Sequence, residues 1–213
     1  MRLTTTTFLT LDGVMQGPGA PDEDRSGGFE HGGWLVPYAD DDMGQIMSDW
    51  FTGVDAFLLG RKTYELFAGH WPQVPDDNPI AAALNGLPKH VVSTTFESLD
   101  WRNSTLIGAD IPARVQALKN QPGRELQVHG SGELIRTLIA HNLIDEYRFL
   151  IYPVFLGKGR RLFEDPALAG AMRLIDSRTT KAGVVVLAYE PAGAPGHGSF
   201  ATAPEPDEHR ILR

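Results

Sequence analysis

"VHGSGELIRTLIAHNLIDE", residues 128–146, joins the end of an apolar strand to the start of a helix. The apolar run ends at Val128 and His129, and Glu133 opens a segment in which apolar residues recur at helical spacing. A strand that passes directly into a helix is the building unit of an α/β sheet. The turn between them, residues 130–132, allows two interpretations: a tight connection, or a cradle whose backbone N–H groups bind a phosphate.

The rest of the chain repeats this alternation. We expect strands over residues 3–11, 54–60, 89–95, 104–108, 125–129 and 146–157. We expect helices over residues 40–52, 61–71, 111–121 and 132–141, and a hairpin of residues 172–180 and 183–191 around Lys181, Ala182 and Gly183. The sequence therefore predicts an α/β fold with a mainly parallel, twisted sheet and an antiparallel C-terminal hairpin.

Two segments lack this alternation. Residues 16–33 are dense in Gly, Pro and acidic side chains and predict a long loop, of the kind that often forms a lid. Residues 191–213 carry several Pro and Gly and few large apolar side chains, so we expect a flexible C-terminal tail. The expected organisation is one domain over residues 1–190, followed by this tail.

Composition and charge narrow the range of functions. The chain has 213 residues, 42% of them hydrophobic, and a formal net charge of −8, which fits one globular domain. The acidic balance argues against nucleic acid or a membrane as partner, and no stretch reaches the ~20 apolar residues of a membrane span. There are no cysteines, and the seven histidines lack metal-ligand spacing, so we expect no metal site and a cytoplasmic protein.

Three strand ends carry residues suited to a phosphate. They are "GRKT" at 60–63, "STT" at 93–95 and "GSG" at 130–132. In an open α/β sheet, ligands bind outside the carboxyl ends of the strands, where helix N-termini attract anions. Arg61 and Lys62 add positive charge. Each motif alone is more often a turn or a cap, but the three together favour a nucleotide site.

Several common catalytic motifs are absent. The sequence contains no G-x-x-x-x-G-K-[ST] phosphate loop, no complete G-x-G-x-x-G and no G-x-S-x-G nucleophile elbow. A metal-dependent nucleotide hydrolase would have only the acidic run at 40–42 to use, and this run is better explained as the start of a helix.

Three further features near strand ends allow more than one interpretation. Asp12 ends the first strand and is either a turn aspartate or a polar group that touches the substrate. His129 either lines the pocket or is a buried structural histidine. The segment 152–163, "YPVFLGKGRRLF", is a basic rim for an anionic substrate, a dimer-facing loop or a solvated turn.

Five segments follow one another in a specific order and spacing. They are "LDG" (11–13), "LLGRKTYE" (58–65), "KHVVSTT" (89–95), "VHGSGELIRTLI" (128–139) and "LIDEYRFLIYPVFLGKGRRLF" (143–163). Over residues 3–190 this order resembles the RibD C-terminal-like family, the reductase domain of riboflavin biosynthesis. The resemblance implies the three-layer dihydrofolate reductase-like fold, NADPH as hydride donor, a small-molecule substrate and a homodimer.

The resemblance also implies roles for individual residues. "GRKT" would bind the cofactor phosphates, "STT" the adenosine half, "GSG" with its two following residues the pyrophosphate and nicotinamide side, and the segment after "LDG" would approach the nicotinamide. The cofactor-binding residues implied are Val14, Met15, Gly60, Arg61, Lys62, Thr63, Ser93, Thr94, Thr95, Gly130, Ser131, Gly132, Glu133 and Leu134. Asp12, His129 and Phe155 are the residues that we expect to face the substrate.

Two departures limit what can be transferred. Dihydrofolate reductases hold the pterin with a carboxylate on the first helix, and that place falls at Gly44 here, about one turn after the acidic run 40–42. The bifunctional riboflavin enzyme adds a zinc deaminase domain with cysteine ligands, for which this chain has neither cysteine nor length. We therefore expect a small pyrimidine- or pterin-like substrate, as in the phosphoribosylaminouracil reductase of riboflavin biosynthesis, rather than folate.

The resulting hypothesis is hydride transfer. NADPH would lie across the carboxyl edge of the sheet, beneath a lid formed by residues 16–33. A hydride would pass to a polarised C=N or C=O carbon, and Asp12 or water would supply the proton. The competing hypothesis is a non-catalytic, dimeric nucleotide- or ligand-binding protein that has kept the fold.

Overall fold

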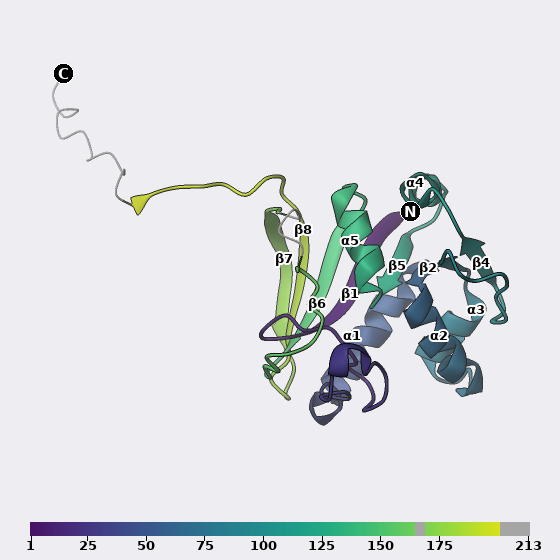
Figure 1. Ribbon diagram of the computed structural model, residues 1–213, viewed down its shortest axis with the longest axis horizontal. Helices are drawn as coiled ribbons and strands as arrows, with labels where there is room; N and C mark the ends of the chain where they lie inside the picture. Colours follow the sequence, from purple (N-terminus) through teal and green to yellow (C-terminus); the bar gives the residue numbers. More distant parts are fainter. Residues whose placement is uncertain (165–168, 201–213) are drawn as a thin grey trace, which may run out of the picture.

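The computed structural model describes residues 1–164 and 169–200. Within these residues, eight strands form one sheet in the order β4-β3-β2-β5-β1-β6-β8-β7 (Figure 1). Their bounds are β1 (Arg2–Thr10), β2 (Val54–Gly60), β3 (Lys89–Val92), β4 (Ser104–Ile107), β5 (Glu125–His129), β6 (Glu146–Tyr152), β7 (Met172–Thr179) and β8 (Val185–Pro191).

The sheet is parallel from β4 to β6 and antiparallel at its other end. β1 pairs in parallel with both β5 and β6, so that Thr6 lies between His129 and Arg148. β8 pairs antiparallel with β6 and with β7, which forms the edge. The predicted fold, a mainly parallel sheet with a C-terminal hairpin, is confirmed.

Helices connect the parallel strands except β3 and β4, which are joined by a loop. The helices are α1 (Asp41–Thr52), α2 (Arg61–His70), α3 (Pro79–Gly86), α4 (Ile111–Lys119) and α5 (Gly132–Ala140), with short 3-10 helices η1 (Ser26–Gly28), η2 (Val36–Tyr38) and η3 (Trp71–Gln73). Helix α3 is absent from the sequence predictions, although Asn78 caps its first turn and Pro79 occupies its first position.

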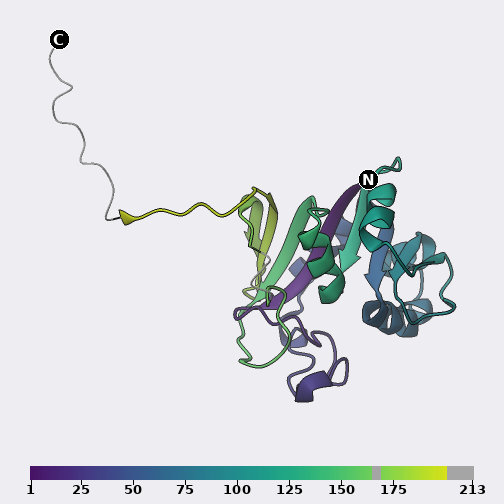
Figure 2. The same ribbon diagram turned by 45° about the horizontal axis from the view of Figure 1, so that its top comes forward.

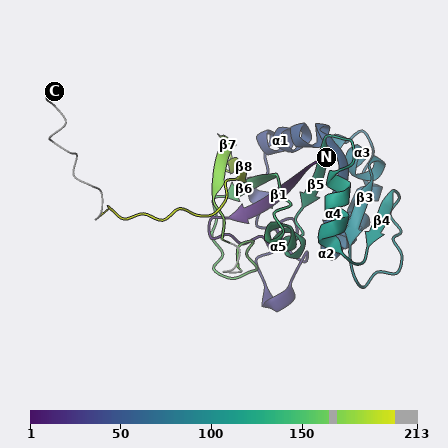
Figure 3. The same cartoon turned by 90° about the horizontal axis from the view of Figure 1, so that it is seen from above.

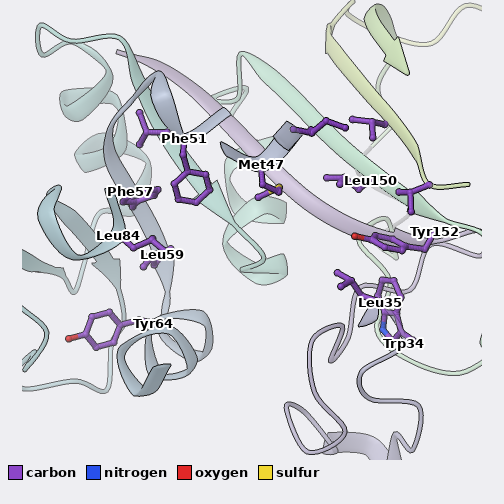
Figure 4. Close-up of a cluster of buried hydrophobic side chains, with 14 of the residues drawn as sticks. Trp34, Leu35, Met47, Phe51, Phe57, Leu59, Tyr64, Leu84, Leu150 and Tyr152 are labelled. Carbon is purple, nitrogen blue, oxygen red and sulfur yellow. The ribbon is translucent and has the colours of Figure 1, made fainter. Parts of the chain in front are cut away.

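Two apolar layers cover the two faces of the sheet. On β2, Phe57 and Leu59 pack towards α1 and α3, whereas Ala56 and Leu58 pack towards α4 and α5. Figure 3 shows α1 and α3 on one face and α4 and α5 on the other, and Figure 4 shows part of the first layer. This alternation is the period-two pattern of a strand buried on both sides.

Some predicted boundaries need correction. The strand expected over 89–95 ends at Val92, and the strand expected over 146–157 ends at Tyr152, directly before Pro153, which cannot donate to the sheet. The predicted tail begins inside the fold, because Pro191 ends β8 and the chain around Ala192 and Gly193 bonds to Ala171. Residues 201–213 of the tail lie outside the described residues.

None of the helices among the described residues is both long and apolar enough to cross a membrane.

Candidate functional site

The position of β5 brings three loops together at the carboxyl edge of the sheet. β5 lies between β1 and β2 and runs parallel to both, so the chain leaves these three neighbouring strands on the same side. These exits are the loop after β1, the start of α2 and the turn at 130–132. In a sheet of this kind such a switch in strand order is where ligands bind.

Ser131 ties two of these exits together. Its Oγ accepts a hydrogen bond from Gly60 N (2.9 Å) and donates to the carbonyl of His129 (2.8 Å). Its backbone N–H donates to Thr63 Oγ1 (3.1 Å). The serine side chain and the threonine hydroxyl therefore hold the start of α2 against the start of α5.

The backbone of the turn is tightly fitted. Gly130 and Ser131 both adopt left-handed conformations, with φ of 51° and 55°. A Cβ on Gly130 would lie 3.2 Å from Thr63 Oγ1, and one on Gly132 would lie 2.8 Å from Met15 Sδ. The left-handed conformation costs Ser131 on the order of 1 kcal/mol, which its hydrogen bonds offset. Met15 thereby lies against the turn, as a residue near a shared ligand would.

Helices α2 and α5 begin at this edge and, like α4, have no side-chain cap. Asp40 and Asn78 cap α1 and α3 with side-chain hydrogen bonds. Gly60 and Ser131, the N-cap residues of α2 and α5, make no such bond. The N-terminal N–H groups of α2 and α5 therefore lack the usual side-chain acceptor, and a bound anion could fill that role.

The two cations of "GRKT" are exposed and paired with acids. Arg61 forms an i,i+4 pair with Glu65 (2.9 Å), and Lys62 lies 3.4 Å from Asp24 of the loop after β1. Exposed pairs of this kind contribute little stability, so both cations can exchange their partners for a ligand at small cost.

The "STT" motif follows β3 beside this edge. Val92 pairs with Gly60, so Ser93 emerges next to the start of α2. Ser93 is buried, and its Oγ accepts bonds from the backbone N–H groups of Thr95 and Phe96, both at 3.2 Å. Its hydroxyl thus shapes the turn, and Thr94 and Thr95 are the exposed members of the motif.

Asp12 is an anchor for the loop after β6. Its carboxylate accepts bonds from Thr10 Oγ1 (2.5 Å) and from the N–H groups of Leu156 (3.2 Å) and Gly157 (2.8 Å), and it pairs with Arg161 (3.1 Å). Burial acts to raise the pKa of Asp12, but these hydrogen bonds outweigh it and lower the pKa to about 2. Of the two interpretations in the sequence analysis, these contacts favour the turn aspartate, and the role of Asp12 as proton donor stays a prediction.

His129 is buried and does not face the edge. Its ring packs against Phe51, with centroids 5.1 Å apart, and its Nε2 lies 2.6 Å from Gln127 Oε1. Burial lowers the pKa of His129 to about 3, with a contribution from the positive charge of Arg148. Of the two interpretations in the sequence analysis, this environment favours the structural histidine.

Gln127 connects His129 to a buried ion cluster under α1. Its amide donates to Glu125 Oε1 (2.8 Å), and Arg148 holds both oxygens of Glu125 at 2.9 Å. Arg148 also bonds Glu146 at 2.6 Å and lies over the ring of Trp50. Removing one member of such a cluster leaves an unpaired buried charge, which is strongly destabilising.

The cations of segment 152–163 bond to neighbouring loops. Lys158 Nζ donates to Gly28 O (2.8 Å), Arg160 bonds Ser26 Oγ (2.6 Å), and Arg161 Nε donates to Asp12 O (2.8 Å). Figure 2 shows this segment beside the loop after β1. Their partners argue against a free basic rim. Phe155 is 77% exposed, and its expected contact with a substrate stays a prediction.

Sequence reasoning missed an aromatic wall between the loop after β1 and the sheet. Tyr152 meets Trp34 edge-on, with centroids 5.3 Å apart (Figure 4). Tyr152 also meets the ring of Tyr38. Trp34 Nε1 donates to Gln16 O (2.8 Å), which fixes the loop on this wall. Trp34 and Tyr38, two aromatic residues in a loop otherwise rich in Gly and Pro, could have indicated this wall in the sequence.

The first turn of α1 is bound to the C-terminal hairpin. Asp40 accepts from Ala182 N (2.9 Å), and Asp42 pairs with Lys181 (3.1 Å). Gly44 follows on the same helix, and a Cβ there would meet nothing within 4 Å. In dihydrofolate reductases, the family resemblance places the pterin-binding carboxylate at this position. This helix has a glycine there, with open space around it.

No three His, Asp or Glu side chains in the described part of the chain come together as a metal site would require.

The fold and this edge define a protein with the dihydrofolate reductase-like fold. A model of the family described as RibD C-terminal domain matches residues 2–186, and the chain belongs to that family. The uncharacterized protein YyaP of Bacillus subtilis (strain 168) is 30% identical over 184 residues, which cover 85% of this chain and 90% of YyaP.

Solved structures agree on the fold. A putative riboflavin biosynthesis protein from Shewanella sp. PV-4 superposes with a TM-score of 0.68 at 21% identity, covering 90% of this chain and 99% of that one. Dihydrofolate reductase from Enterococcus faecalis, complexed with NADP(H), superposes with a TM-score of 0.58 at 11% identity, covering 89% of this chain and 96% of that one.

Proposed function

We propose that the protein is an NADPH-dependent reductase of a small pyrimidine-like heterocycle. The observation that carries this proposal is the pair of helix N-termini, of α2 and α5, held together by Ser131 and left without side-chain caps. A dinucleotide has the two adjacent phosphates that such a pair would bind. The family match and the NADP(H) complex of a structural neighbour support the same choice.

The residues at this edge fit the cofactor. Gly130 and Gly132 carry no side chain, so Thr63 and Met15 pack directly against the turn, and a diphosphate would meet the uncapped N–H groups that open α5. Arg61 and Lys62 would add charge to the phosphates, and the exposed Thr94 and Thr95 would meet the adenosine half. When bound, the cofactor would supply a hydride. Met15, against Gly132, would border the nicotinamide side, together with Val14.

The chain itself would orient the reactants and exclude water. The loop at 16–33, held on the aromatic wall by Trp34, would cover the site. Because Asp12 is ionised and fully bonded, the proton would come from water. The proposal therefore assigns Asp12 a positioning role for the loops and no proton transfer.

The substrate class follows from the family and from Gly44. Riboflavin biosynthesis is the process named for the Shewanella neighbour. The open position at Gly44 offers no carboxylate to a pterin ring. We expect an aminopyrimidine to be reduced and dihydrofolate to be left unchanged.

The test is an assay of NADPH oxidation with phosphoribosylaminouracil, and with dihydrofolate as the control acceptor. The proposal expects oxidation with the pyrimidine alone. Saturable NADPH binding without oxidation by any acceptor would instead support the second candidate, a binding protein that has kept the fold. Asp12 is ionised and Gly44 has no carboxylate, so neither position offers a proton donor. This observation favours the binding protein over other classes of enzyme.

The proposal includes a homodimer and a cytoplasmic location, where the NADPH pool is held. Phe163 and Leu174, which are 49% and 48% exposed, offer apolar surface near the antiparallel end of the sheet. Sedimentation equilibrium should give twice the mass of the chain; a monomer at micromolar concentration would contradict this part.

A further inference from the structure

One carboxylate, that of Asp24, joins three separate segments of the chain. It pairs with Arg160 of the loop after β6 and lies 3.4 Å from Lys62 in the first turn of α2. Its other oxygen accepts from Ser26 N (3.0 Å) and Ser26 Oγ (2.6 Å). The Asp24 side chain is only 16% exposed, so these contacts are shielded from water more than those of an ordinary surface ion pair.

Neighbouring contacts hold the rest of this segment, residues 24–29, which we call the latch segment. The buried Gln16 donates through Nε2 to the carbonyls of Asp24 (3.1 Å) and Ser26 (3.0 Å). Phe29 is 2% exposed and would be struck by any side chain added at Gly159. The latch segment is therefore closed against the loop after β6.

The latch uses cations that a phosphate ligand would need. Lys62 lies in the first turn of α2, whose N-terminus has no side-chain cap and whose start is joined to the glycine turn. A phosphate at this helix end and the Asp24 carboxylate would repel each other across a few ångströms. Burial raises the pKa of Asp24, but bonds from Ser26 and Arg160 outweigh it and hold the pKa well below its usual value.

We propose that Asp24 is an internal competitor for phosphate, which latches the loop to Lys62 and Arg160 until a nucleotide diphosphate takes its place beside Lys62. The proposal rests on the proposed function insofar as the diphosphate belongs to NADPH. It makes Asp24 a residue that sets affinity and gates access, and it explains why an acid sits among the cations of a phosphate site.

The first experiment needs no ligand. Chymotrypsin should cut after Phe29 about fivefold faster in the full-length Asp24→Asn variant than in the wild-type protein, because the latch segment opens more often. Asp22→Asn is the matched control: Asp22 lies in the same loop, and within residues 1–164 and 169–200 its one ion pair is with the exposed Arg25. Equal cleavage rates for Asp24→Asn and Asp22→Asn would overturn the latch, and melting curves would confirm that both variants are folded.

The second experiment compares NADPH affinity in the same variants and in Lys62→Gln. Both Asp24→Asn and Lys62→Gln should open the latch segment, but Asp24→Asn should tighten NADPH binding about threefold to tenfold, whereas Lys62→Gln should weaken it. Weaker or unchanged binding by Asp24→Asn would overturn the competition. If the wild-type protein bound no NADPH, the proposed function and the competition would fail together, whereas proteolysis would still decide whether Asp24 latches the loop.

Discussion

Hydrogen-bond partners, more than residue type, decide what a titratable side chain does at this edge of the sheet. Asp12 and His129 both stand at strand ends where a ligand was expected. Asp12 is instead held by backbone N–H groups some 145 residues away along the chain, and His129 is enclosed by aromatic rings. Each has a lowered pKa, and its contacts favour a structural role.

Asp12→Asn should lower the free energy of unfolding at pH 7 by about 1–3 kcal/mol, because the bonds to Gly157 and Arg161 lose their charge. The native pKa of about 2 lies below the ordinary value of 3.8. The stabilisation is therefore complete above pH ~4 and is lost as the pH falls towards 2. Urea titrations at pH 7 and pH 2.5 should show the difference from wild type shrinking. A difference independent of pH would contradict the role of the charge.

His129→Gln should flatten the pH dependence of stability on the acid side. In the unfolded chain His129 takes up a proton below the ordinary value of 6.5, but in the native protein it stays neutral down to about 3. The wild type therefore loses stability as the pH falls from 6.5, by up to about 1.4 kcal/mol per unit for one proton. Unfolding free energies at pH 7, 6 and 5 should fall less steeply in the variant, and parallel slopes would show that His129 is not buried as described.

At the scale of elements, two glycines differ in the space that a side chain would find around them. Gly44 lies in the interior of α1, where glycine weakens a helix, and a Cβ would meet nothing within 4 Å. Gly159 has a φ of +128°, and its Cβ would approach Val14 to 2.6 Å and Phe29 to 2.9 Å.

Gly44→Ala should raise the free energy of unfolding by about 1 kcal/mol and the melting temperature by about 2–4 °C. Gly159→Ala, the matched control for glycine removal, should lower stability by about 1–3 kcal/mol because it forces two loops apart. Thermal melts of both variants check this. A destabilised Gly44→Ala would mean that α1 is covered at that position.

The elements with clear periodicity could be predicted from the sequence, and those fixed by tertiary contacts could not. β5 and α5 are found close to their predicted bounds because apolar spacing and the turn at 130–132 define them. Helix α3 was missed because its short alanine-rich run shows little difference in hydrophobicity between its faces. The buried Lys89 helps to end this helix by donating a hydrogen bond to Leu84 O (2.7 Å). β3 stops at Val92 because Ser93 turns the chain with its own side chain.

For the whole molecule, strand order is what assembles the site. Residues 14–15, 60–63 and 130–132 are far apart in sequence and meet because β5 inserts between β1 and β2. The motifs could be recognised from the sequence through the family resemblance. Contacts between loops, such as those of Asp24 with Lys62 and Arg160, have no local pattern and needed the structure.

The central claim is that a dinucleotide binds across this edge, with its phosphates at α2 and α5. The most direct measurement is an NADPH titration followed by tryptophan fluorescence, with wild type, Arg61→Ala and Arg124→Ala. Arg124 is a matched control, because it forms a similar exposed ion pair with Asp55. It directly precedes the first residue of β5, at the end of the strand opposite to the glycine turn. We predict saturable binding, about tenfold weaker in Arg61→Ala and unchanged in Arg124→Ala. No saturable signal, or equal affinities of wild type and Arg61→Ala, would contradict the account.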